Sequence, residues 1–162
     1  MIRKANTNDL EGIVQINVNA WMINYKGIID DDFLQKRTVE VVFKRWKESN
    51  WIEDNEISTF VYEENNIIKG FVSQKKDSGK YDCKIGSIYI DPLYQNKGIG
   101  KKLLQYMKTH FKNIGYKSII IWTIKSFQNN SFYHNQGDKI HEETEYQYGS
   151  KKYPGIGFVF EL

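Results

Sequence analysis

Residues 85–115 constrain the fold of this chain most, because a short strand, a glycine-bearing loop and a helix follow one another there. Ile85, Ser87, Tyr89 and Asp91 alternate with Gly86, Ile88 and Ile90, which predicts a strand that Pro92 ends. The helix expected over 98–115 carries its apolar side chains on one face, and Gly115 closes it. Such a loop directs free backbone N–H groups outward at the positive end of the helix dipole. The segment is therefore typical of a site for a pyrophosphate.

The rest of the chain fits one domain over residues 1–162, since we find no internal repeat and no linker rich in proline, glycine or serine. Strands and helices occur in mixed order, which implies an α/β fold with a mixed sheet. Thr7 or Asn8 is the expected N-cap of the first helix, and residues 64–66 predict a hairpin turn. The expected helices are 7–25, 33–46 and 127–135, and the expected strands are 2–5, 57–63, 67–74, 118–124, 139–147 and 156–161.

Charge and cysteine content exclude several classes of protein. The 162 residues contain 23 Lys and Arg against 20 Asp and Glu, a formal charge of +3, and few of the basic residues are arginine. This mild basicity fits an anionic ligand better than a nucleic acid, because arginine usually leads phosphate and base contacts. The single cysteine, Cys83, excludes an internal disulfide and a four-ligand zinc site around it, so we expect a buried or half-buried thiol and no metal.

The chain lacks the apolar segments that export or membrane insertion requires. Its first residues, Met1-Ile-Arg-Lys, are not the start of a signal peptide with an apolar core, and the longest strongly apolar run, 119–122, is far too short to span a bilayer. We therefore expect a cytoplasmic protein with neither a membrane nor a nucleic acid as partner.

Two other phosphate-binding loops do not fit the glycine-bearing segment. The Walker pattern needs glycine where Gln95 stands and serine or threonine where Lys102 stands. The dinucleotide fingerprint needs a small residue in place of Leu103 and an acid near Lys125, at the end of the next strand. Neither of these two loops therefore accounts for the segment.

A resemblance to a known family lies in two segments. Residues 88–104 resemble the acetyl-coenzyme A motif of the GNAT superfamily of N-acetyltransferases, and residues 131–137, with a Phe-Tyr pair ahead of a glycine, resemble its second signature. The segment 20–28 is similar to the acceptor-side helices of many members. The resemblance implies a GNAT-like fold with a mainly antiparallel twisted sheet and flanking helices. Its fourth and fifth strands would splay apart to form the cofactor cleft.

The resemblance also implies the reaction and the residues that carry it. A primary amine of a small molecule or peptide would attack the thioester of acetyl-coenzyme A directly. Tyr133 matches the tyrosine that protonates the departing thiolate, and Trp21 and Tyr25 match the acceptor pocket. A homodimer is common for such domains. The residues that the resemblance assigns to acetyl-coenzyme A are Ile88, Tyr89, Ile90, Gln95, Asn96, Lys97, Gly98, Ile99, Gly100, Lys101 and Ser126.

Two departures from the family pattern leave the general base open. Lys84 stands at the start of the fourth strand, where an acid is common, and Asp138 follows the signature glycine, where an aromatic residue is usual. A non-catalytic acyl-coenzyme A-binding sensor is therefore the alternative function. The sequence does not fix the acceptor amine, because acceptor loops vary freely on one fold.

Overall fold

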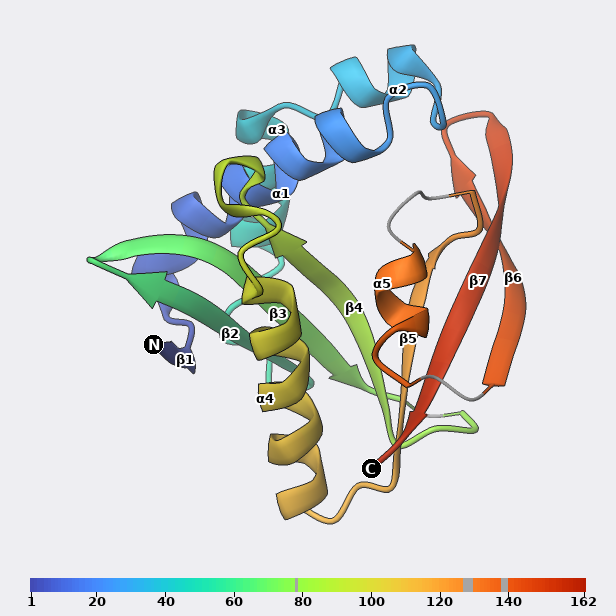
Figure 1. The fold of residues 1–162 in the computed structure, drawn as a ribbon. Helices are drawn as coiled ribbons and strands as arrows, with labels where there is room; N and C mark the ends of the chain where they lie inside the picture. Colours follow the sequence, from blue (N-terminus) through green and yellow to red (C-terminus); the bar gives the residue numbers. More distant parts are fainter. Residues whose placement is uncertain (78, 127–129, 138–139) are drawn as a thin grey trace.

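The computed structural model describes residues 1–77, 79–126, 130–137 and 140–162. Within these residues seven strands form one sheet in the order β1-β2-β3-β4-β5-β7-β6 (Figure 1). All neighbours are antiparallel except β4 and β5, which are parallel, so the predicted α/β fold with a mixed, mainly antiparallel sheet is confirmed. The strands are β1 (Ile2–Lys4), β2 (Ile57–Glu64), β3 (Ile67–Lys76), β4 (Cys83–Ile90), β5 (Ser118–Ile124), β6 (Ile140–Tyr148) and β7 (Lys151–Glu161).

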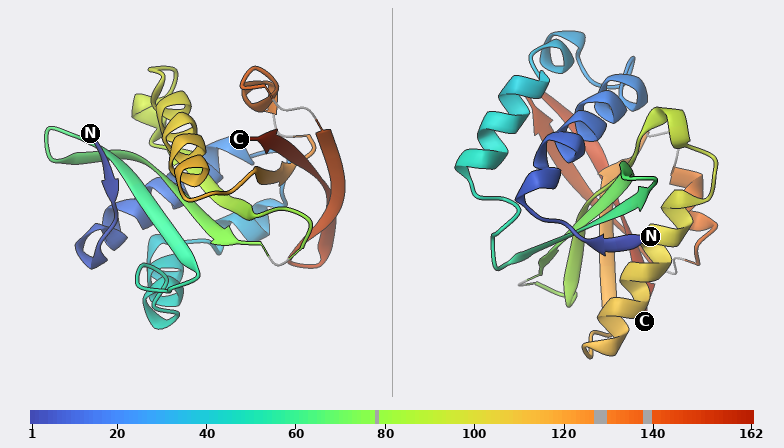
Figure 2. Two further views of the ribbon diagram at one scale, coloured as in Figure 1. Left: turned by 90° about the horizontal axis from the view of Figure 1, so that it is seen from below. Right: turned by 90° about the vertical axis from the view of Figure 1, so that its left-hand side faces the viewer.

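Helices cover both faces of this sheet. They are α1 (Leu10–Asn24), α2 (Asp31–Gln35), α3 (Val39–Glu48), α4 (Ile99–Asn113) and α5 (Asn130–His134). Figure 2 shows α1 and α3 on one face and α4 on the other. Because strand side chains alternate between faces, Val61 and Phe71 pack against α1, whereas Phe60 and Val72 belong to the core under α4. No helix among the described residues is long and apolar enough to cross a membrane.

The first helices differ from the expected elements in two details. The side chain of Asn6 caps the first turn, so the predicted caps Thr7 and Asn8 are wrong by one or two residues. The single helix expected over 33–46 is two helices, α2 and α3. The reason is Thr38, whose Oγ1 accepts a hydrogen bond from the backbone of the following turn and starts α3 anew.

The hairpins follow the sequence more closely. The turn predicted at 64–66 is confirmed, since Asn65 and Asn66 have the positive φ values, 54° and 58°, that a two-residue hairpin loop of this kind needs. β7 begins earlier than the predicted residue 156, because Pro154 does not break the strand and stays in register with Glu145 on β6. The first residues of the helix expected over 127–135 lie outside the described residues.

Candidate active site

β4 and β5 separate near the middle of the sheet. They pair over three residues, from Cys83 to Ile85 on β4, although β4 continues to Ile90. Beyond Ile85 the edge of β4 that faces β5 has no strand partner among the described residues. The fourth and fifth strands therefore splay apart, as predicted.

The separation coincides with a β-bulge at Gly86. In the ladder with β3, Ser73 pairs with Ser87 and Gln74 pairs with Ile85, which leaves Gly86 as the extra residue on β4. A bulge bends its strand and increases the local twist, and this bend carries β4 away from β5. A glycine in the interior of a strand often marks such a bulge.

The bulge also exchanges the two faces of β4. Cys83 and Ile85 before it and Ile88 and Ile90 after it all pack in the core under α4. The regular alternation predicted for this strand is therefore wrong at the bulge, because the extra residue shifts the pleat by one position. Tyr89 consequently points to the α1 side of the sheet.

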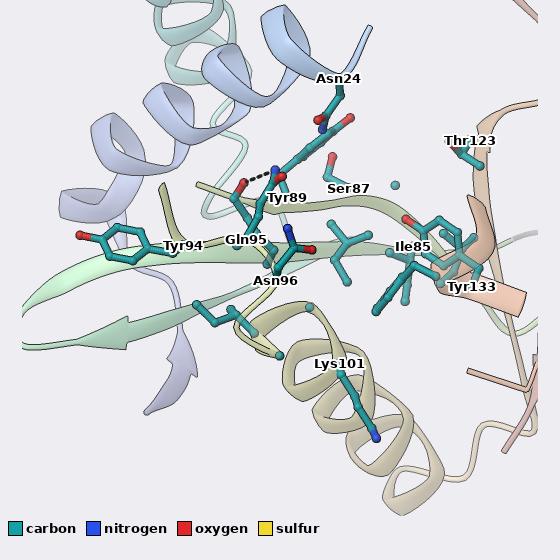
Figure 3. Close-up of a pocket in the computed structure, with 18 of the residues that line it drawn as sticks. Asn24, Ile85, Ser87, Tyr89, Tyr94, Gln95, Asn96, Lys101, Thr123 and Tyr133 are labelled. Carbon is teal, nitrogen blue, oxygen red and sulfur yellow. Dashed lines mark hydrogen bonds between the residues drawn. The ribbon is translucent and has the colours of Figure 1, made fainter. Parts of the chain in front are cut away.

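A cavity of about 340 Å³ lies between the separated strands and the start of α4 (Figure 3). A Cβ atom on Gly86 would meet no other atom within 4 Å, so the bulge borders open space. The predicted site residues that line the cavity are Tyr25, Ile88, Tyr89, Ile90, Gln95, Asn96, Gly98, Ile99, Gly100, Lys101 and Tyr133.

Three other predicted site residues do not line the cavity. Trp21 is buried behind its wall, where it bonds to Tyr89. The Lys97 ammonium lies 5.2 Å from the centre of the Tyr94 ring. Ser126 is exposed in the turn after β5. A contact of Lys97 or Ser126 with the coenzyme stays a prediction.

The wall also contains residues that the sequence analysis did not single out. They are Asn24, Ile85, Gly86, Ser87, Tyr94, Ile121, Trp122, Thr123 and Phe132. Two of these carry a signal in the sequence: Gly86 interrupts an apolar strand, and Thr123 is the polar residue inside the apolar run 119–124. Phe132 belongs to the Phe-Tyr pair of the second signature, and the others carry no such local signal.

The start of α4 fits a pyrophosphate. Gly98 is the N-cap in the left-handed conformation, with φ of 77°, and Asn96 precedes it with φ of 59°. No side-chain hydrogen bond caps this helix, so the backbone N–H groups of its first turn remain for a ligand. Lys101 adds a positive charge in the same turn. This uncapped helix start therefore matches the diphosphate of a coenzyme.

Tyr133 stands in another part of the wall, on α5. Its ring stacks on Phe158 at a centroid distance of 5.0 Å, and its side chain is almost fully buried. The hydroxyl faces the cavity (Figure 3), and no hydrogen bond joins it to another described residue. Burial raises the pKa of this phenol well above that of a free tyrosine. Tyr133 is thus a neutral hydrogen-bond donor at physiological pH.

Aromatic side chains from α1 and β4 back the cavity on the opposite face. Trp21 Nε1 donates a hydrogen bond of 2.8 Å to Tyr89 Oη, and the Arg37 guanidinium lies 4.1 Å from the centre of the Trp21 ring. Burial raises the pKa of Tyr25, and the neighbouring hydroxyls of Tyr89 and Thr123 oppose part of that rise. Hydroxyl groups from three different elements therefore meet at the gap between the strands.

The described part of the wall contains no carboxylate and no histidine. Lys84 is exposed and does not line the cavity. Asp138 lies outside the described residues. The described wall therefore offers hydroxyl groups, backbone groups and the Lys101 ammonium, and it does not supply a carboxylate base.

A sheet that opens between two parallel strands, beside an uncapped glycine-started helix, is the architecture of N-acetyltransferases that draw their acyl group from a coenzyme A thioester. The model of the acetyltransferase (GNAT) family matches residues 24–137, so the chain belongs to this family. It is an N-acetyltransferase with acetyl-coenzyme A as its acetyl donor.

Individual relatives align with nearly the whole chain. The uncharacterized N-acetyltransferase YuaI of Bacillus subtilis is 22% identical over 160 residues, covering 96% of this chain and 90% of that protein. Spermidine N(1)-acetyltransferase of Thermoplasma acidophilum is 25% identical over 157 residues, covering 89% and 90%. The crystal structure of the PaiA N-acetyltransferase of Thermoplasma acidophilum with coenzyme A has a TM-score of 0.72 at 24% identity, with 96% of each chain covered. This last likeness shows the fold.

Proposed function

We propose that the enzyme moves the acetyl group directly to a primary amine of a small molecule or peptide, with both reactants held between β4 and β5. The observation that carries this proposal is the opening at Gly86, which joins the uncapped start of α4 to the buried hydroxyl of Tyr133 through one cavity. Holding the two reactants in line converts a bimolecular encounter into a step within one complex.

In this proposal the chain holds acetyl-coenzyme A in two places. The N–H groups from Ile99 to Lys101 bind the pyrophosphate at the helix start. The unpaired edge of β4, from Gly86 to Ile90, offers backbone groups to the amides of the pantetheine arm, as an added strand would. The bound coenzyme supplies a thioester carbonyl that an amine can attack.

The residues around that carbonyl have separate tasks. The backbone N–H of Ile90 stabilises negative charge that develops on the carbonyl oxygen. The carbon–nitrogen bond forms while the carbon–sulfur bond breaks, and Tyr133 donates its phenolic proton to the departing sulfur. The amine gives up one proton to water, and a proton from water restores Tyr133, so the protons balance.

The acceptor proposed here is a monoamine or a peptide amine, although one relative is a spermidine acetyltransferase. A polyamine carries further ammonium groups that need carboxylates, and the described cavity wall has none. Asp30 ahead of α2, and Glu143 and Glu145 on β6, are each paired with a lysine. The cytoplasmic location and the homodimer remain predictions.

The sensor function stays as the second candidate, because the described wall supplies no carboxylate base and Lys84 stands outside it. Release of coenzyme A from acetyl-coenzyme A, measured with alkyl monoamines, spermidine and lysine peptides, separates the two functions. Turnover on any of these amines refutes the sensor. Binding of acetyl-coenzyme A without turnover on all of them refutes the enzyme.

Gly86→Val tests the position of the coenzyme. Gly86 does not have a positive φ and its Cβ would enter open space, so the variant should fold with an unchanged melting temperature. The valine side chain would occupy the path of the pantetheine arm, and the rise in melting temperature caused by acetyl-coenzyme A should vanish. Ser87→Ala, which removes an atom from the neighbouring position, should keep that rise. An undiminished rise in Gly86→Val would place the coenzyme elsewhere.

A further inference from the structure

The hydroxyl of Thr123 is buried beside the phenol of Tyr25. Its side chain lies on β5, where the strand has parted from β4, and it is 7% exposed. The Oγ1 atom is buried and has no hydrogen-bond partner within the described part of the chain. Thr123 nevertheless lines the cavity, so this hydroxyl belongs to the wall that a bound molecule would touch (Figure 3).

An unpartnered buried hydroxyl lowers the stability of the folded state. Four buried side-chain atoms among the described residues lack a partner, in Arg37, Thr59, Thr123 and Asn130. Of these four residues, Thr123 is the one that lines the cavity. A ligand in the cavity can therefore supply the missing partner only to Thr123.

The surroundings of Thr123 determine what kind of partner fits. The phenol of Tyr25 neighbours the hydroxyls of Thr123 and Tyr89, and Tyr89 and Tyr133 line the same cavity. Burial raises the pKa of all three phenols, so they are neutral below pH 9. Lys101 on α4 is the charged side chain of the described wall. A neutral, desolvated nitrogen suits this environment better than an ammonium ion does.

We propose that Thr123 Oγ1 accepts a hydrogen bond from an N–H of the neutral acceptor amine and so directs the nitrogen lone pair at the thioester carbonyl. This role rests on the proposed function and names a specific contact of the acceptor. A primary amine has two N–H groups and one lone pair, so it can donate one hydrogen to Thr123 Oγ1 and keep the lone pair for the carbonyl carbon. The bond holds the amine without taking its proton.

The thioester carbonyl is the less suitable partner for this hydroxyl. The proposed donors to that oxygen come from the backbone of β4, across the gap, whereas Thr123 stands on β5 beside the acceptor-side residue Tyr25. The two assignments differ in what they predict for the coenzyme. If Thr123 contacted the carbonyl, it would strengthen the binding of acetyl-coenzyme A relative to coenzyme A. If Thr123 contacts the amine, it does not change this ratio.

Thr123→Val tests the proposal, because valine keeps the shape and removes the hydroxyl. We expect kcat/KM for the amine to fall about 10- to 100-fold. The melting temperature should not fall, and the rises caused by acetyl-coenzyme A and by coenzyme A should match those of the unaltered protein. Thr123→Ser should restore most of the activity.

Thr59→Val is the matched control. Thr59 also carries a buried hydroxyl without a partner, it is 2% exposed on β2, and it does not line the cavity. Its valine variant should keep full kcat/KM. Full activity in Thr123→Val would overturn the proposal. So would the loss, in that variant, of the difference between the melting-temperature rises that acetyl-coenzyme A and coenzyme A cause. If the unaltered protein has no turnover on any amine, the proposed function itself fails. That outcome is distinct from a failure of the Thr123 proposal, in which the unaltered protein is active.

Discussion

Tyr133 combines a buried aromatic ring with a hydroxyl that has no partner among the described residues. Phe132 and Phe158 hold the ring, at centroid distances of 5.2 and 5.0 Å. The hydroxyl faces the cavity, where a departing sulfur would offset the cost of burying it. Its raised pKa keeps the proton in place until an anion forms nearby.

Tyr133→Phe removes this hydroxyl and keeps the ring. We expect kcat to fall about 10- to 100-fold, at the low end for general acid catalysis because a thiolate is already a good leaving group. KM for acetyl-coenzyme A should change little, as expected for an interaction made mainly in the transition state. Steady-state kinetics with Tyr94→Phe as control checks this, since Tyr94 also lines the cavity. An unchanged kcat, with chemistry rate-limiting, would make Tyr133 a structural residue.

Trp21 and Tyr25 show what the family resemblance can give at this scale. The resemblance assigned both residues to the acceptor pocket. The structure separates their positions: Tyr25 lines the cavity, and Trp21 supports Tyr89 from behind. The difference depends on where α1 ends relative to the gap between β4 and β5, which is a property of the packed sheet.

Among the elements, α1 begins after Asp9, a residue held by several hydrogen bonds. Asp9 is 6% exposed, and its carboxylate accepts hydrogen bonds of 2.7 and 2.8 Å from the Arg3 guanidinium. The backbone N–H of Asn6 donates a further bond of 2.8 Å, which completes a capping box. The bonds from Arg3 hold the pKa of Asp9 below its usual value.

Asp9→Asn should lower the free energy of unfolding by about 2 kcal/mol at pH 7. Because the folded pKa is depressed, the contribution of the carboxylate is complete above the unfolded pKa, near 4, and is lost as the pH falls through the folded value. Urea unfolding measures this: the difference in the free energy of unfolding between the variant and the unaltered protein should be smaller at pH 3 than at pH 7. Asp31→Asn, at an exposed position of α2, is the control. An equal difference in the free energy of unfolding at both pH values would contradict a stabilising role of the Asp9 carboxylate.

β4 shows how one residue can decide the function of an element. The bulge at Gly86 bends the strand, and the bend opens the edge on which the proposed pantetheine contacts depend. The strand itself was predicted from its apolar alternation, but the change of face at Gly86 was not. A bulge needs a partner strand with one residue fewer, and that partner, β3, lies elsewhere in the sequence.

In the whole molecule, the acceptor side is closed by contacts between distant segments. Lys151 at the start of β7 pairs with Asp30 ahead of α2 at 2.5 Å. The backbone N–H of Asp30 donates to Tyr153 Oη over 3.0 Å, and Phe33 packs on Tyr148. These contacts join the α1–α2 connection to the β6–β7 hairpin (Figure 1). The capping of α2 by Asp30 shows that this acid has a structural task as well.

The pH profile of the enzyme is a property of the whole site. The described wall contains no carboxylate or histidine, and burial keeps Tyr25, Tyr89 and Tyr133 protonated below pH 9. The acceptor amine, with a pKa near 10 for an alkylamine, is then the group that must lose a proton. We expect kcat/KM for such an amine to rise about 10-fold per pH unit from pH 6 to 9. A plateau below pH 7 would reveal a base that the described wall does not contain.

The sequence alone determined the glycine-bearing loop, the helix after it, the Ile-rich strand and the turn at 64–66, because each depends on residues that are close neighbours in the chain. It therefore also determined the GNAT resemblance. Tertiary structure decided that Tyr25, Thr123 and Tyr133, from α1, β5 and α5, meet in one gap. That meeting depends on a bulge between two strands and on helices packed against opposite faces of the sheet. Such long-range contacts produce no repeating pattern in the sequence, so they could not be predicted from it.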